Sequence, residues 1–306
     1  MQLVIFCHRN DGKKEKHMKR LLMILVVSAI GMTATWAQKY DLNGDGIVNS
    51  GDVVSLYNYI INGGDDEVTD QVFTVNGVSF KMIGVEGGSF YMGTHSWISE
   101  KNHPQVSLSN YSIGETVVTQ ALWKAVMGKT PTDDESQWDD WHGLGDNYPA
   151  YYVSYEDALE FIAKLNILTG KTFRLPTEAE WEFAAIGGKY THDFTVSGSD
   201  NIYDVAWFEK NSSNGIVDKG LHPVKEKNAN ELKIYDMSGN IYEMCYDWYE
   251  ELSDGPLVNP NGPTHGVWRV MKGGCYGSEA KDCESSSRSY TTPTTRVDFQ
   301  GFRLAM

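Results

Sequence analysis

A short helix with a complete N-terminal capping signal is predicted in the middle of the chain, within Arg174-Leu175-Pro176-Thr177-Glu178-Ala179-Glu180-Trp181-Glu182. The Thr177 hydroxyl can accept from the amide of Glu180, and the Glu180 carboxylate can accept from the amide of Thr177, which is a capping box. Apolar Trp181, Phe183 and Ala184 follow. The stretch therefore predicts a short helix that begins after Thr177 and buries these apolar side chains.

Two longer helices are predicted on the N-terminal side of this stretch. Thr119 can cap a helix that ends at Gly128, and Ser154 with Asp157 can cap one that ends at Gly170. Apolar residues recur at helical spacing in both segments. Elsewhere the chain consists of short β-rich runs and long loops rich in Gly, Asn and Asp.

A hairpin is predicted where this β-rich pattern begins. The runs Val72–Val75 and Val78–Met82 are separated by Asn76-Gly77, the usual signal for a two-residue turn. Few helices, many irregular segments and one continuous domain over residues 72–306 predict the α+β class.

Composition predicts a folded, acidic protein. Of 306 residues, 41% are hydrophobic and 22% charged, and the formal net charge is -15. This hydrophobic content supports a core. An acidic chain offers no basic face to nucleic acid or an anionic membrane, so neither is an expected partner.

Residues 1–37 have the pattern of an export signal. Met18-Lys19-Arg20 precedes the apolar run Leu21–Met32, and small Thr35 and Ala37 occupy the cleavage positions before Gln38. Met18 is a candidate true start. The apolar run is too short for a membrane span. We expect a periplasmic or extracellular protein; the alternative is a signal that stays attached as an anchor.

A calcium loop is predicted directly after the signal. Hard oxygen ligands occupy the required loop positions, and Gly46 permits the sharp turn. The predicted ligands are Asp41, Asn43, Asp45, the Ile47 carbonyl, Asn49 and Asp52. A helix, Val53–Ile61, follows.

Residues 38–62 thus resemble one repeat of a dockerin, the calcium-dependent module that docks enzymes onto cohesin scaffolds. A dockerin has two repeats, and this sequence has one. Docking to a cohesin-like partner and a purely structural calcium hairpin both remain open. A Gly- and Asp-rich linker, residues 63–71, leads into the main domain.

The main domain carries six ordered motifs that resemble the formylglycine-generating enzyme (sulfatase-modifying factor) family. They are Val85–Gly93, Glu115–Thr119, Arg174–Glu182, Asp236–Glu243, Arg269–Gly274 and Gly301–Ala305. The resemblance covers almost all of residues 85–306. It implies a C-type-lectin-like fold of the formylglycine-generating type.

The resemblance also locates the family's catalytic pair. Its enzymes oxidise a sulfatase cysteine to formylglycine with oxygen and a copper(I) ion held by two cysteines, soft ligands that copper(I) prefers. Those cysteines occupy the fourth and ninth places after the Gly-Gly motif, which here are Ser278 and Cys283. Cys275 stands where the family has a serine. The pair is broken, which argues against copper; a rearranged site of Cys275 and Cys283 is the alternative.

Two further features follow from the resemblance. Relatives with similarly placed cysteines suggest a Cys245–Cys283 disulfide, with Cys275 as a buried thiol. The family's structural calcium site would use four residues here, Asp236, Gly239, Ile241 and Glu243. The alternative is that Glu243 pairs with an arginine such as Arg303.

An aromatic and acidic segment is the remaining candidate. Residues 138–142 read Trp-Asp-Asp-Trp-His, and Tyr148, Tyr151 and Tyr152 follow. Rings and carboxylates can stack on sugars and hydrogen-bond to them, although loop aromatics also simply pack.

The leading prediction is an exported calcium-binding protein that binds a protein or glycan ligand or acts in envelope assembly, without the catalytic pair. One alternative is an oxidase with a rearranged site. The other is a dockerin-borne accessory of a glycan-degrading assembly.

Overall fold

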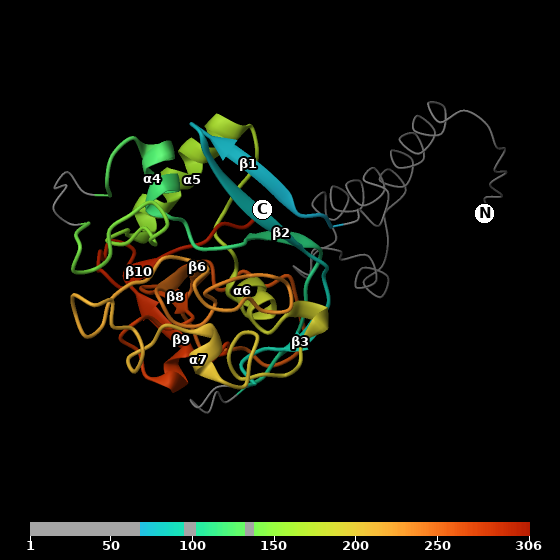
Figure 1. Cartoon of the computed structure of the whole chain (residues 1–306). Helices are drawn as coiled ribbons and strands as arrows, with labels where there is room; N and C mark the ends of the chain where they lie inside the picture. Colours follow the sequence, from blue (N-terminus) through green and yellow to red (C-terminus); the bar gives the residue numbers. More distant parts are fainter. Residues whose placement is uncertain (1–67, 95–101, 132–137) are drawn as a thin grey trace, which may run out of the picture. The chain divides into compact units, whose positions relative to one another are not determined.

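The computed structural model describes residues 68–94, 102–131 and 138–306 (Figure 1). The predicted export signal and calcium loop lie outside the described residues. The strands are β1 Gln71–Val75, β2 Val78–Val85, β3 Ser89–Tyr91, β4 Gln105–Ser107, β5 Tyr111–Gly114, β6 Tyr242–Trp248, β7 Leu257–Val258, β8 Arg269–Lys272, β9 Arg288–Thr291 and β10 Gln300–Gly301. The helices are α4 Gln120–Met127, α5 Tyr155–Thr169, α6 Glu178–Ala185 and α7 Ile202–Val205, with 3-10 turns η2 Gly188–Tyr190 and η3 Ala280–Cys283. The mixture confirms the α+β class.

The predicted hairpin is confirmed. β1 and β2 pair antiparallel from Val75–Val78 to Gln71–Met82, and β5 joins the other edge of β2. Asn76 and Gly77 both have positive φ, 47° and 85°, as a hairpin turn of this length requires. In Figure 1, α4 and α5 lie beside this hairpin, and all four elements are in contact.

The three predicted helices begin after their predicted N-caps, and α4 and α5 also end at the predicted glycines, Gly128 and Gly170. Thr119 accepts from the Leu122 amide, and Gly128 ends α4 in the left-handed conformation. Ser154 with Asp157 forms a full capping box before α5. Thr177 with Glu180 does the same before α6. Local sequence was sufficient here because each cap satisfies its own helix terminus.

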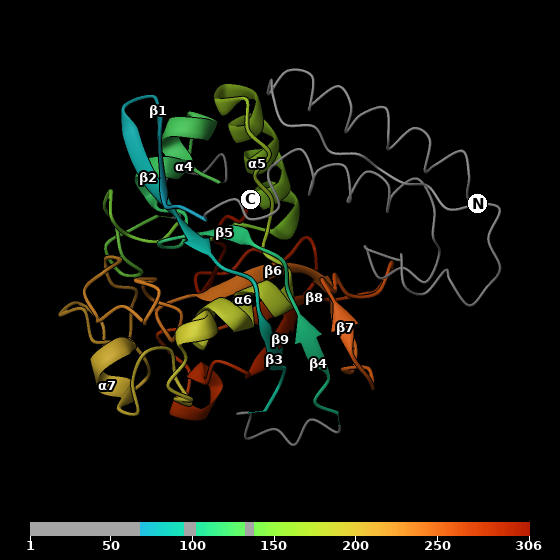
Figure 2. The same cartoon turned by 90° about the vertical axis from the view of Figure 1, so that its right-hand side faces the viewer.

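A four-stranded sheet of order β10-β6-β8-β9 forms the centre of the C-terminal half, and α6 packs against β6 and β8 (Figure 2). A small third sheet, β3-β4-β7, joins residues near 90 and 106 to residues near 257. All eight residues of α6 are buried, which an apolar face alone does not explain.

The buried carboxylates of α6 are each matched by a cation. Glu178 takes two bonds from Arg288, Glu180 two from Arg174, and Glu182 one from Lys272, all between 2.5 and 2.9 Å. Burial of a carboxylate is tolerable only with such partners. These pairs fix α6 to the adjoining strands.

Candidate functional site

A chain of acidic, histidine and tyrosine side chains joins two loops that are distant in sequence. The Asp139 carboxylate lies 2.8 Å from Nδ1 of His142, and Nε2 of His142 lies 3.4 Å from Oδ2 of Asp298. The Tyr276 hydroxyl donates to the same Asp298 oxygen at 2.5 Å. We name these residues, with Tyr151 and Tyr152, the tyrosine–acid site.

Aromatic rings surround His142. Tyr151 and Tyr152 each have ring centroids 6.0 Å from its imidazole, and their own centroids are 5.3 Å apart. Tyr152 has φ 55°, an unfavourable value for a bulky residue, and its amide donates to the Val297 carbonyl at 3.0 Å. Such strain is often stored at functional sites. His142 and Asp298 keep about a third and a quarter of their side-chain surface exposed, so solvent reaches the site.

Burial keeps the tyrosine hydroxyls protonated. It raises the pKa of Tyr276, and the adjacent Asp298 carboxylate raises it further. The pKa of Tyr152 is raised by burial and by Asp298 as well. The site therefore combines phenol donors with acidic side chains, a set suited to hydrogen bonding with a polar ligand.

Cys275 and Ser278 form a tight turn beside this site. The Ser278 hydroxyl accepts from the Cys275 amide at 2.9 Å and lies 3.4 Å from both the Cys275 thiol and the Tyr242 hydroxyl. Gly273 and Gly274, at positive φ, lead into the turn. Burial raises the pKa of Cys275, which disfavours the thiolate form of this side chain in the metal-free protein.

The predicted Cys245–Cys283 disulfide is not formed in the structure. Cys245, Cys275 and Cys283 are all buried free thiols. Cys245 packs in the core cluster around α6, whereas Cys283 packs in a separate cluster with Ala206 and Phe208. Burial raises the pKa of all three, as expected for inert core cysteines.

The four residues expected to bind calcium do not form a fitting site. Both Glu243 oxygens accept from Arg303, and one also accepts from the Trp181 indole at 2.7 Å. Glu243 and Arg303 have no exposed side-chain surface. A cation here would face a buried guanidinium and be repelled by it. The alternative, the Glu243–Arg303 pair, is the arrangement that the structure shows.

Two other predicted calcium ligands, Asp236 and Gly239, accept hydrogen bonds from nearby backbone amides. Oδ2 of Asp236 accepts from the Lys225 amide at 2.9 Å, and the Gly239 carbonyl accepts from the Ile241 amide at 2.8 Å. Burial raises the pKa of Asp236 to about 6 in the metal-free protein. Across residues 68–94, 102–131 and 138–306, no group of three or more His, Cys, Asp or Glu side chains is arranged to hold a metal ion.

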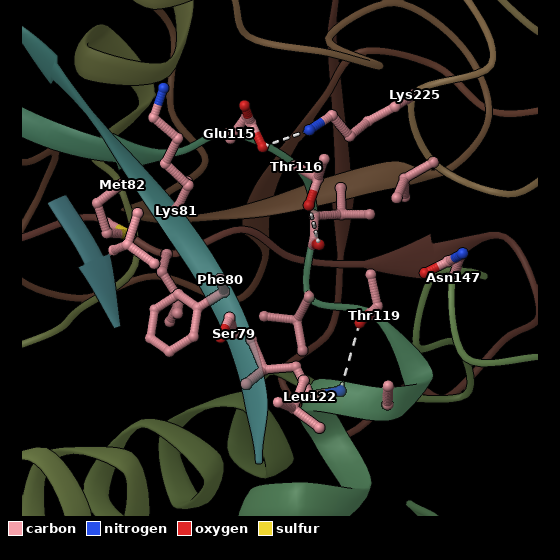
Figure 3. Close-up of a pocket in the computed structure, with 18 residues that line it drawn as sticks. Ser79, Phe80, Lys81, Met82, Glu115, Thr116, Thr119, Leu122, Asn147 and Lys225 are labelled. Carbon is pink, nitrogen blue, oxygen red and sulfur yellow. Dashed lines mark hydrogen bonds and ion pairs between the residues drawn. The ribbon is translucent and has the colours of Figure 1, made fainter. Parts of the chain in front are cut away.

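A groove of about 280 Å³ lies between β2 and the segment 115–119 (Figure 3). An ion pair at its rim joins Lys225 and Glu115 at 2.6 Å, and Val118 and Leu122 are among its apolar lining. None of the predicted metal ligands or cysteines lines it. The groove is therefore separate from the metal-binding and cysteine positions that the sequence predicts.

Sequence reasoning missed Asp247, a buried carboxyl group beside α6. Its Oδ2 accepts from the Glu178 amide at 2.8 Å, and burial together with the Glu178 charge raises its pKa from 3.8 to about 8. The folded protein thus holds a proton here that the unfolded chain releases at about pH 4. This contribution to stability is present at low pH and is lost as the pH rises through 8.

Asp247→Asn is therefore expected to flatten the pH dependence of stability. The amide keeps the acceptor for Glu178 but cannot ionise. Between pH 5 and pH 9, the free energy of unfolding of the wild type should fall more steeply than that of the variant. Urea unfolding at several pH values measures both slopes. Parallel slopes would show that Asp247 does not hold the proton.

The loop-rich α+β fold and the glycine-led turn at Cys275–Ser278 define the class of protein: a domain of the formylglycine-generating type. The family described as the sulfatase-modifying factor enzyme 1-like domain matches residues 72–306, and the chain belongs to this family.

Known relatives differ in described role. "Chaperone protein LppX" of Paenibacillus barcinonensis is 32% identical over 246 residues, which cover 68% of this chain and 83% of that protein. The formylglycine-generating enzyme of Streptomyces coelicolor is 33% identical over 173 residues, 52% of each protein. The match thus spans about half the length of that enzyme.

Among solved structures, Treponema denticola variable protein 1 has a TM-score of 0.68 and 32% identity, and the match covers 77% of this chain and 98% of that one. PvdO of Pseudomonas aeruginosa, at 24% identity and a TM-score of 0.64, shares the fold. Within the described ranges, no helix has the length and apolar character needed to cross a membrane.

Proposed function

We propose that this chain is an exported binding protein, with a C-type-lectin-like domain, and that its ligand is a glycan held at the tyrosine–acid site. The observation that carries the proposal is the meeting of residues 139–152 with residues 276–298 in one partly exposed cluster of rings and carboxylates. Sugar rings stack on aromatic faces, and their hydroxyl groups bond to carboxylates and phenols.

Asp298 is the residue whose change should most affect this binding. It contacts both His142 and Tyr276, so it fixes the geometry of the site. A hydrogen bond to a charged group contributes about 1.5–3 kcal/mol, and we expect Asp298→Asn to weaken binding at least about tenfold. A glycan array followed by calorimetry measures this.

Asp218→Asn is the matched control, because it removes the same charge from an exposed residue outside the site. It should leave the affinity unchanged. Equal affinities of the wild type and Asp298→Asn for every bound glycan would exclude this site. If the protein binds peptides but no glycan, the ligand class is protein and the glycan proposal is wrong.

The turn formed by Cys275 and Ser278 supports a non-catalytic role. Ser278 stands at one of the two cysteine positions of the family, and its hydroxyl bonds within the turn. The thiol of Cys275 is buried and has a raised pKa. A two-coordinate copper(I) site is held by two cysteines; residues 275–278 supply one, so a rearranged site would also need Cys283. An oxidase with a rearranged site remains the alternative.

Calcium binding is proposed for the loop 41–52 alone, on its ligand spacing. Docking of residues 38–62 to a cohesin-like partner, as part of a glycan-degrading assembly, is the second alternative. Asp45→Ala is expected to abolish calcium uptake measured by calorimetry, because it removes a charged ligand from the loop. Asp236→Asn should retain it. Loss of uptake in Asp236→Asn but not in Asp45→Ala would reassign calcium to the main domain.

A further inference from the structure

Three aromatic rings meet at the N-terminal end of β8. The turn at Cys275 lies beyond the other end of this strand. The ring centroids of Trp268 and Tyr290 are 5.0 Å apart, and those of Tyr249 and Tyr290 are 5.1 Å apart. Trp268 is 43% exposed and Tyr290 51% exposed. We name these three residues the aromatic platform. Contiguous exposed apolar surface often marks an interaction site.

The backbone holds the aromatic platform in place. The Tyr249 amide donates to the Trp268 carbonyl at 2.7 Å, and Tyr290 pairs with Val270 across β8 and β9. This register places the three rings on one face of the sheet. Beneath them the Arg288 guanidinium lies 4.7 Å from the Tyr249 ring and is paired with buried Glu178. The contacts among the rings and with Arg288 restrict their positions, which lowers the entropic cost of ordering them on a ligand.

We propose that the aromatic platform is a second glycan-binding surface that stacks an uncharged sugar ring. The C–H faces of a pyranose pack well against exposed aromatic rings. Polar groups for its hydroxyls are close in sequence, because the exposed segment that joins Tyr249 to Trp268 carries Ser253, Asp254 and Thr264.

Charge disfavours the other common stacking ligand, a nucleobase. Nucleobases also stack on tyrosine and tryptophan, but they bring phosphates that need a basic surface. The chain carries a net charge of -15, and exposed Glu250 and Glu251 directly follow Tyr249. The net charge and these two glutamates disfavour a polyanion, and Arg288 beneath the rings is already neutralised by Glu178; a neutral sugar needs no basic surface.

The aromatic platform does not depend on the tyrosine–acid site. Trp268 directly precedes β8, whereas Tyr276 of the tyrosine–acid site follows the end of that strand. A change in one site should therefore leave the other unaltered. This separation lets one experiment examine both.

The test is a glycan array probed with the full chain as wild type, Trp268→Ala, Tyr290→Ala and Asp298→Asn. We expect at least one array glycan whose affinity falls about tenfold or more in Trp268→Ala and Tyr290→Ala but is unchanged in Asp298→Asn. Trp268→Phe, which keeps a ring, should retain most of the binding. Val267→Ala, which removes an exposed apolar neighbour, should retain all of it.

Thermal unfolding checks that each variant is folded. If Trp268→Ala is too unstable to assay, Tyr290→Ala tests the aromatic platform in its place. Absence of any bound glycan, or glycan binding that both platform variants retain, would overturn the proposal. If Trp268 is required for binding a protein ligand but for no glycan, the proposal is overturned in favour of a protein-docking surface. Loss of glycan binding only in Asp298→Asn would support the tyrosine–acid site and overturn this second surface.

Discussion

Replacing Arg303 with Met is expected to lower the free energy of unfolding by about 3–5 kcal/mol, the usual result of removing one partner from a buried ion pair. Glu243 would keep only the Trp181 indole as a partner for its charge. Arg303 also donates to the Gly114 and Tyr235 carbonyls. Its loss would therefore also remove a hydrogen bond from each of these two backbone groups. Urea unfolding of wild type and variant measures the difference.

Two further variants separate charge from packing. Arg296→Met breaks a bidentate pair with Asp157 whose arginine is 43% exposed, and should cost about 1 kcal/mol or less. The double variant Arg303→Met, Glu243→Gln removes the stranded charge and should recover part of the loss. A double variant no more stable than Arg303→Met would show that the carboxylate charge is not the cause.

Replacing Lys272 with Met should have a comparable effect, about 3–5 kcal/mol, because it leaves Glu182 charged and buried. Lys272 Nζ lies 2.9 Å from Glu182 Oε2, and neither side chain is meaningfully exposed. Glu182 would retain one bond, from the Gly93 amide at 2.6 Å. Met has a similar length and apolar stem, so the variant changes charge more than volume.

Lys164→Met is the matched control for Lys272→Met. Lys164 pairs with Glu160 one turn away on the surface of α5, at 2.8 Å and largely in solvent. Such a pair contributes about 0.3–0.5 kcal/mol. Denaturation of both variants under one set of conditions compares them directly. Equal losses in the two would contradict the claim that burial makes the Lys272–Glu182 pair important.

The local part of the fold could be predicted from the sequence. The hairpin at Asn76-Gly77 and the helices after Thr119, Ser154 and Thr177 follow from turn and cap chemistry within a few residues. The buried state of Glu178 and Glu182 could not be predicted. Their partners Arg288 and Lys272 lie about a hundred residues away, and only tertiary packing brings them together.

The candidate site was predicted in part. Tyr151, Tyr152 and His142 belong to the aromatic and acidic segment that the sequence indicates, and the structure brings them together with Tyr276. Nothing in the local sequence singles out Asp298, which completes the cluster. The contact between Glu243 and Arg303 could not be predicted, because the residue type at Glu243 suits calcium equally well whether or not Arg303 lies against it.

The most direct test of a binding rather than oxidising role is a turnover measurement. Copper(I)-loaded protein is incubated under oxygen with a peptide that carries Cys-x-Pro-x-Arg, and mass spectrometry follows the cysteine. A formylglycine-generating enzyme assayed in parallel establishes that the peptide is competent. We predict that this protein leaves the cysteine intact, because Ser278 places a hydroxyl where the family's enzymes have one of their two copper-binding cysteines. Conversion of the cysteine to the aldehyde over many turnovers would contradict the account.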